Sequence, residues 1–284
     1  MNILKKNTDS AVIAAALSLM LGAAVQTILL FVGRVNYIPD FIRLSVVTIP
    51  AMLIPVLLIG KQKNTPVYSI HEKKLSPAKS ILFIISGFAV CTALNFLFSL
   101  LRSLLSANNS ASAAEGNDLT GFLLMLFSAG ILPAILEEIL FRGKILPLLT
   151  EGGKGFSVFI SAVLFAFIHN GIFNIVFAFT AGLVLGFIRS ETKRLVPCII
   201  VHLLNNTLAL LIMFFHSSLS KDLSDMFFYI SGIAGIIISA AMLPFILKFC
   251  CKDCFILSRE PFITLLRSPV FYVFILSAVI MQVL

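Results

Sequence analysis

Acidic and basic side chains interrupt one of the long apolar runs of this sequence. The segment Leu136-Glu137-Glu138-Ile139-Leu140-Phe141-Arg142 continues from an apolar run without a polar linker. On a helix, Glu138 and Arg142 lie four positions apart and share a face, whereas Glu137 is rotated by about 100 degrees. We therefore expect Arg142 to neutralise Glu138 and to leave Glu137 free to act as a base in a cavity. In the alternative interpretation, both glutamates anchor a helix end at the cytoplasmic interface.

Two histidines lie in later apolar runs. His169 ends the stretch Phe165-Ala166-Phe167-Ile168-His169-Asn170, and His202 begins His202-Leu203-Leu204-Asn205-Asn206. A single histidine near a helix end is more often structural than catalytic, but two in the same four-span unit as the glutamate pair shift this balance towards catalysis. His202 and Asn206 are four positions apart, so their imidazole and carboxamide groups can donate to one point. This arrangement suits an oxyanion hole.

Three further asparagines stand close to these histidines in the sequence, namely Asn170, Asn174 and Asn205. They are able to line the same cavity or to bond to backbone across helices. We expect the structural role for them and leave them outside the candidate site.

The composition indicates that membrane helices hold these residues. Of the 284 residues, 59% are hydrophobic and 12% are charged, against about 45–50% and about 25% in an ordinary soluble domain. A soluble domain of this size must present a polar exterior to water, so lipid is the solvent expected around the excess of apolar surface. The net charge of +8 does not indicate nucleic acid as a partner, because the basic residues are dispersed between apolar runs.

The apolar runs predict an all-α polytopic transmembrane bundle of about eight to nine spans, with the active site inside a core of four. A transmembrane helix needs about 20 mostly apolar residues. The expected span cores are 11–32, 41–60, 81–101, 121–136, 156–169, 172–188, 196–215, 227–247 and a short last one, 270–284. We expect a single membrane domain over 1–284, a catalytic core at 121–215 and a basic juxtamembrane segment at 248–268. The first run is expected to be a retained span and not a cleaved signal peptide.

The loop charges predict that the N-terminus is cytoplasmic. The cytoplasmic segments then contain Lys5, Lys6, Lys61, Lys63, Lys73, Lys74, Lys79, Arg142, Lys144, Lys154, Arg189, Lys193, Arg194, Lys248, Lys252, Arg259 and Arg267. The opposite side keeps only Arg34, Arg43, Arg102 and Lys221. We expect a multi-pass protein of the bacterial cell membrane.

Three motifs together resemble the CPBP family of intramembrane proteases, also called the CAAX protease and bacteriocin-processing or Abi family. They are Glu137-Glu138-x-x-x-Arg142, Phe165-x-x-x-His169 and His202-x-x-x-Asn206, each in an apolar segment and in the family's order. The resemblance covers roughly residues 121–215. Any one of the motifs is weak evidence, whereas the ordered triplet is specific. The family includes the type II CAAX prenyl endopeptidases.

The resemblance implies roles for four residues. Glu137 and His169 would bind and activate the attacking water, with Glu137 as general base, and His202 and Asn206 would stabilise the tetrahedral oxyanion. Glu138 and Arg142 would then be a supporting pair. Hydrolysis of a peptide bond needs these functions, namely a positioned water, a base and donors aimed at the developing charge.

Zinc is the alternative to metal-independent catalysis. The family has also been described as metal-dependent, and Glu137, His169 and His202 are able to form a zinc site with an open water position. The sequence lacks a His-Glu-x-x-His helix, and Asn206 is better explained as a second donor beside His202. We therefore favour catalysis without a cofactor.

The sequence leaves more than one function open. The leading hypothesis is an endopeptidase that cuts a membrane-associated protein or peptide, prenylated or not, near the cytoplasmic side. A transporter or proton-coupled permease would use the same Glu, Arg and His residues, although no repeated half is visible. A non-enzymatic membrane scaffold is the third hypothesis. The expected partners are the lipid bilayer and a membrane-anchored substrate.

Overall fold

Helices account for almost all of the chain that is described by the computed structural model, which covers residues 3–33, 38–59, 75–105, 118–249 and 258–283. No strand occurs within these ranges. The α-helices are α1 Ile3–Gly33, α2 Asp40–Ile59, α3 Pro77–Leu105, α4 Leu119–Met125, α5 Leu132–Leu140, α6 Leu146–Leu149, α7 Lys154–Ala166, α8 Ile172–Thr192, α9 Val196–Ser218, α10 Lys221–Phe249, α11 Arg259–Leu266 and α12 Pro269–Val283. The predicted all-α class is confirmed.

The helices make the chain a multi-pass integral membrane protein. Within the described residues, seven helical segments are long and apolar enough to cross a membrane, and there are eight if α11 and α12, bent by 70° at their junction, count as one span. The segment Leu119–Gly152 is continuous and contains α4, α5 and α6. In the part of the chain that the structure describes, each of the nine predicted span cores falls on a helix, although 167–169 of the fifth core lie beyond α7. Helix α7 has only 13 residues, fewer than the roughly 20 that a span needs. The described residues therefore contain seven or eight candidate membrane spans.

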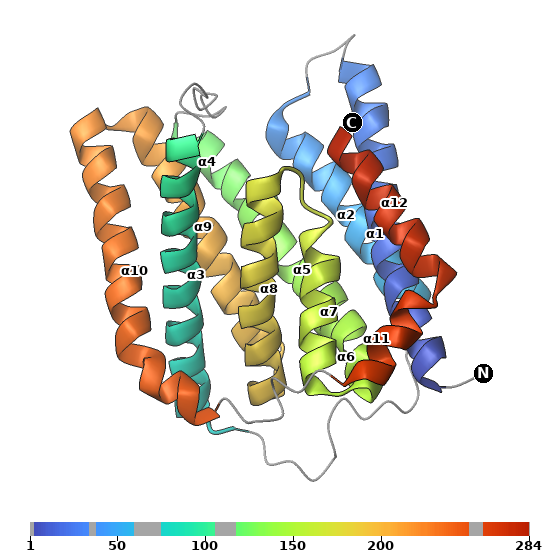
Figure 1. Ribbon diagram of the computed structural model, residues 1–284. Helices are drawn as coiled ribbons and strands as arrows, with labels where there is room; N and C mark the ends of the chain where they lie inside the picture. The colour runs from blue at the N-terminus through green and yellow to red at the C-terminus, as the bar shows by residue number, and fades with distance from the viewer. Residues whose placement is uncertain (1–2, 34–37, 60–74, 106–117, 250–257, 284) are drawn as a thin grey trace.

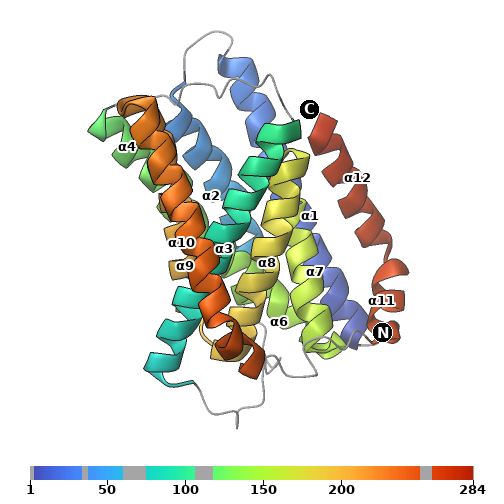
Figure 2. The same ribbon diagram turned by 60° about the vertical axis from the view of Figure 1, so that its left-hand side comes forward.

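The helices form one bundle around α3, α5, α8 and α9. Figure 1 shows α10 beside α3 on one flank and α1, α2 and α12 together on the other. The turned view in Figure 2 keeps α8 between α3 and α7 and leaves α12 at the edge. The N-terminal end of α1 and the C-terminal ends of α8 and α10 lie at the same end of the bundle (Figure 1). These ends carry many of the basic residues, as the predicted topology requires, and the cytoplasmic assignment of this end stays a prediction.

Glycine allows α7 and α8 to pack closely. A Cβ added at Gly182 of α8 would lie 3.1 Å from the Cα of Ala162 in α7, and one at Gly186 would lie 3.0 Å from a methyl group of Val158. Small residues of this kind let membrane helices approach each other where no hydrophobic driving force acts between them. The close contact holds α7, and the loop that follows it, against the centre of the bundle.

The basic segment predicted at 248–268 lies partly outside the described residues, since 250–257 are not among them. The described part contains α11, in which Leu265 is buried and Phe262 packs edge-on against Phe156 of α7 with ring centroids 5.1 Å apart. This helix therefore contacts the bundle directly.

Candidate active site

The two glutamates lie on a short α-helix between two turns of π-helix. The π segments are η1 (Leu126–Ile131) and η2 (Phe141–Ile145), and α5 between them carries Glu137 and Glu138. A π turn bonds residue i to i+5 and appears frequently at functional sites. The wider turn leaves backbone carbonyls without their usual helical partner, so other side chains must satisfy them.

Side chains from neighbouring helices bond to these carbonyls. Asn206 of α9 donates from Nδ2 to the carbonyl of Ala129 in η1 at 3.3 Å. Arg189 of α8 donates from Nε to the carbonyl of Arg142 in η2 at 3.2 Å. Unsatisfied backbone groups are costly in the hydrocarbon region, so these bonds fix α5 relative to α8 and α9.

Glu138 and Arg142 form a completely buried ion pair. Arg142 Nη1 lies 2.8 Å from Glu138 Oε1, and neither side chain is exposed. Arg142 Nη2 also donates to the carbonyl of Gly182 at 3.2 Å, and its guanidinium lies 4.4 Å from the centroid of the Phe165 ring. The Glu138 charge is thus neutralised inside the bundle, as expected from the spacing of the two residues. One expectation is corrected, because Arg142 is a buried residue within a helical segment and not a charge of a loop.

His202 of α9 lies between the two carboxylates. Its Nδ1 is 2.9 Å from Glu138 Oε1, and its Nε2 is 3.8 Å from Glu137 Oε2. Since a carboxylate only accepts hydrogen bonds, Nδ1 carries a proton and donates it to Glu138. Nε2 is then the nitrogen that faces Glu137. The gap of 3.8 Å is too long for a direct hydrogen bond, but both atoms can contact one water oxygen at normal distances.

His169 follows the end of α7 and is oriented by Phe165. Its Nδ1 lies 2.9 Å from the backbone carbonyl of Phe165, so Nδ1 is the donor and Nε2 is the nitrogen left for other partners. The Phe165 ring meets the His169 ring edge-on, with centroids 4.9 Å apart, and meets the His202 ring at 6.0 Å. One aromatic side chain therefore separates the two imidazoles.

The two histidines and Asn206 line one cavity of about 160 Å³. Its walls consist of Cys91, Phe165, His169, Asn174, Phe177, Ala178, Ala181, Leu185, Val201, His202, Asn205 and Asn206. A water occupies about 30 Å³ of liquid, so the cavity has room for a few water molecules or a short part of a substrate. Polar groups at this depth in a helical bundle mark functional sites.

Sequence reasoning missed Cys91 and undervalued Asn205. Cys91 lies on α3 and is buried, and nothing in its apolar surroundings in the sequence distinguishes it. Asn205 lines the cavity and is 7% exposed, and its Oδ1 is buried without a hydrogen-bond partner. Asn174 also lines the cavity and donates to the carbonyl of Asn170 at 2.8 Å, a local bond and not the bond across helices that was expected. The position of Asn205, three residues after His202 in the same apolar run, was the feature of the sequence that could have placed it at the cavity.

The described residues do not fit a metal ion as they are placed. They contain no group of three His, Cys, Asp or Glu side chains able to hold one. Glu137, His169 and His202 are therefore not arranged as a zinc site.

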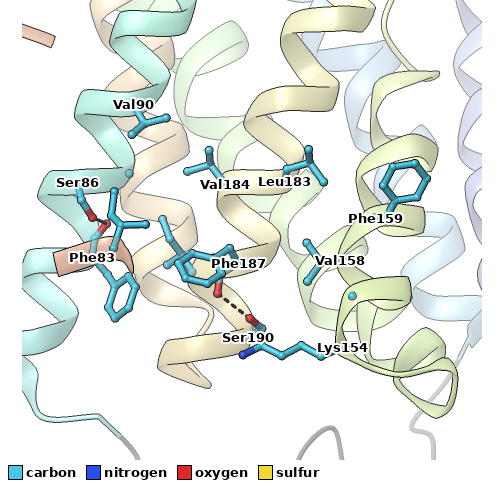
Figure 3. Close-up of a pocket in the computed structure, with 14 residues that line it drawn as sticks. Phe83, Ser86, Val90, Lys154, Val158, Phe159, Leu183, Val184, Phe187 and Ser190 are labelled. Carbon is cyan, nitrogen blue, oxygen red and sulfur yellow. Dashed lines mark hydrogen bonds between the residues drawn. The ribbon is translucent and has the colours of Figure 1, made fainter. Parts of the chain in front are cut away.

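A separate pocket of about 390 Å³ lies between α3, α7 and α8. Figure 3 shows Phe83 and Val90 on one side of it, Val158 on the other, and Lys154 at one end. Its lining is almost wholly apolar and contains none of the predicted site residues. Of the predicted site residues, His169, His202 and Asn206 instead line the smaller, more polar cavity.

Residues 119–208 match the family model described as type II CAAX prenyl endopeptidase Rce1-like. This segment is an Rce1-like domain. No curated protein and no solved structure matched the chain. The Rce1-like domain includes Glu137, His169, His202 and Asn206, whereas Cys91 lies outside it. The predicted family is confirmed over about the same part of the chain as the three motifs.

Proposed function

We propose that this protein is an intramembrane endopeptidase that hydrolyses a peptide bond of a membrane-associated protein or peptide. The observation that carries the proposal is the contact of His202 with both carboxylates, 2.9 Å from Glu138 and 3.8 Å from Glu137, within an Rce1-like domain. A stability role does not need a second carboxylate beside an imidazole in an apolar bundle. A hydrolytic site needs a base next to a donor.

In the proposed reaction, Glu137 and His169 hold the attacking water, and Glu137 takes one of its protons. The water oxygen then attacks the carbonyl carbon of the scissile bond, which becomes a tetrahedral oxyanion. The proton passes from Glu137 to the leaving nitrogen, the C–N bond breaks, and a carboxylate and an amine are released. The Phe165 carbonyl bound to His169 Nδ1 keeps His169 Nε2 available to accept from the water.

His202 and Asn206 are proposed to bind the oxyanion. Nδ1 of His202 is bonded to Glu138, which leaves Nε2 as the ring nitrogen that faces the developing charge. The Asn206 carboxamide has two N–H groups. Its contact with Ala129 uses one and leaves the second for the substrate. A preorganised donor of this kind typically contributes about 100- to 1000-fold to kcat.

Glu138 and Arg142 are proposed as supporting residues that orient His202. The carboxylate Oε1 of Glu138 is shared between Arg142 and His202, so the ion pair sets the position of the ring. The catalytic core is proposed to extend over 121–215. The substrate class implied by one branch of the family is a prenylated C-terminal peptide, and peptides without a lipid are the alternative.

The test uses the purified full chain in proteoliposomes with a farnesylated CAAX peptide and an unprenylated peptide of the same sequence. Glu137→Gln keeps the shape of the side chain and removes the base, so cleavage is expected to disappear. Glu151→Gln, on an exposed glutamate of η3 (Thr150–Gly152), is the matched control and should cleave normally. Full activity of Glu137→Gln would refute the proposal. Glu137-dependent solute flux without cleavage would instead establish a transporter.

A further inference from the structure

The last helix, α12, contacts the loop that carries His169 through one side chain. Gln282 accepts a hydrogen bond at Oε1 from the backbone N–H of Gly171 at 2.8 Å. Its Nε2 donates to the backbone carbonyl of His169 at 2.9 Å. One carboxamide therefore joins both ends of the tripeptide 169–171 to a helix more than 100 positions away.

Two backbone groups of the loop 169–171, the N–H of Gly171 and the carbonyl of His169, have their hydrogen-bond partner on another helix. Gly171 is the N-cap residue of α8, has a φ of +85° and has no side chain to cap the helix. A helix start leaves backbone N–H groups without intrahelical partners, and the N–H of Gly171 is satisfied by Gln282. The carbonyl of His169 lies beyond the end of α7 and is satisfied by the same side chain.

We propose that Gln282 is a positioning residue for His169, which rests on the proposed function. The backbone of His169 is held by Gln282, and its ring is held by the Phe165 carbonyl at Nδ1. With both contacts made, Nε2 keeps a fixed place at the cavity. Without Gln282, the loop turns about the Gly171 backbone and carries the imidazole away from the water that Glu137 activates.

The position of α12 supports this role. The Phe274 ring is completely buried and meets Phe167, two residues before His169, edge-on with centroids 6.2 Å apart. The helix also packs along α1. Helix α12 is therefore held in place by its contacts with Phe167 and with α1, so the Gln282 carboxamide restrains the loop 169–171.

The experiment compares Gln282→Met with Tyr272→Phe in full-length protein in proteoliposomes. Methionine keeps the length of the side chain and removes both bonds. Tyr272 also lies on α12 and donates to the backbone carbonyl of Leu266 at 2.8 Å, so its variant loses a comparable bond away from the site. Amide exchange at Gly171 should become faster in Gln282→Met only. With the farnesylated peptide, kcat should fall by about 10- to 100-fold, as expected for a catalytic group displaced by about 1 Å, with KM unchanged.

A second measurement separates positioning from a general structural role. In a His169→Ala background, Gln282→Met should cause no further fall in the residual rate, whereas a structural role would lower it again. If Gln282→Met fails to fold, Gln282→Glu keeps the acceptor for Gly171 and should give a smaller fall in kcat.

The outcomes distinguish the two claims. If Gln282→Met shows the same amide exchange at Gly171 and the same kcat as Tyr272→Phe, the proposed role of Gln282 is refuted. Normal cleavage by both variants would leave the proposed function standing. A normal chain that cleaves neither peptide nor any membrane protein refutes the proposed function, and with it the role of Gln282, whichever way the exchange result falls.

Discussion

The buried pair Glu138 and Arg142 allows a quantitative prediction about stability. Arg142→Met keeps most of the volume of the side chain and removes its charge, leaving Glu138 completely buried without its cationic partner. Removal of one partner of a buried pair costs about 3–5 kcal/mol. The carbonyl of Gly182 also loses its donor, an effect of about 1–3 kcal/mol that does not simply add. We expect a free energy of unfolding lower by at least about 3 kcal/mol.

The matched control is the exposed pair of Arg43 and Asp40 on α2, whose side chains are 38% and 32% exposed. Solvent-exposed pairs contribute about 0–1 kcal/mol, so Arg43→Met should change stability by no more than that. The assay is reversible unfolding of both variants in mixed detergent micelles, followed by circular dichroism. The double variant Glu138→Gln with Arg142→Met should recover part of the loss, since it leaves no buried charge.

The result that would refute this reasoning is an Arg142→Met protein as stable as Arg43→Met. It would mean that water or another cation compensates Glu138, and that Arg142 does not set the position of His202. A destabilised Arg142→Met protein that the double variant does not rescue would place the cost in lost packing against Phe165.

Three further outcomes are expected. His202→Gln should lower kcat on the farnesylated peptide by about 100- to 1000-fold while detergent unfolding shows a folded protein; a fall of less than about threefold would exclude His202 as an oxyanion donor. Gly182→Leu should destabilise the protein by about 1–3 kcal/mol in the same unfolding assay, because its Cβ would lie 3.1 Å from the Cα of Ala162. Cys91→Leu should lower kcat on the farnesylated peptide, since Cys91 lines the cavity and a larger side chain would occupy part of it; an unchanged kcat would contradict this.

The sequence predicted the fold class, the helical segments and the family because these depend on composition and on short local motifs. It placed Glu138 and Arg142 on one helical face, and the structure contains their ion pair. The span count was less accurate because apolar length alone does not reveal that α7 ends at Ala166. The sequence wrongly assigned Arg142 to a cytoplasmic loop, because the position of a residue in the sequence does not show whether its side chain is buried.

The contacts between distant parts of the chain were beyond sequence reasoning. The π turns around α5 have no local signature, since the carbonyls that they free are satisfied by Asn206 and Arg189 from other helices. The same holds for the contact of Gln282 with His169, made across 113 positions. Spacing within one helix is encoded locally, whereas the pairing of helices is fixed by packing of the whole bundle.

The central claim is that Glu137 makes this protein a peptide hydrolase of the membrane. Its most direct test is mass spectrometry of membrane peptides from cells that carry the normal chain or Glu137→Ala at equal, folded abundance. We predict new peptide termini that occur with the normal chain and are lost with Glu137→Ala. Identical sets of termini from the two kinds of cell would contradict the claim.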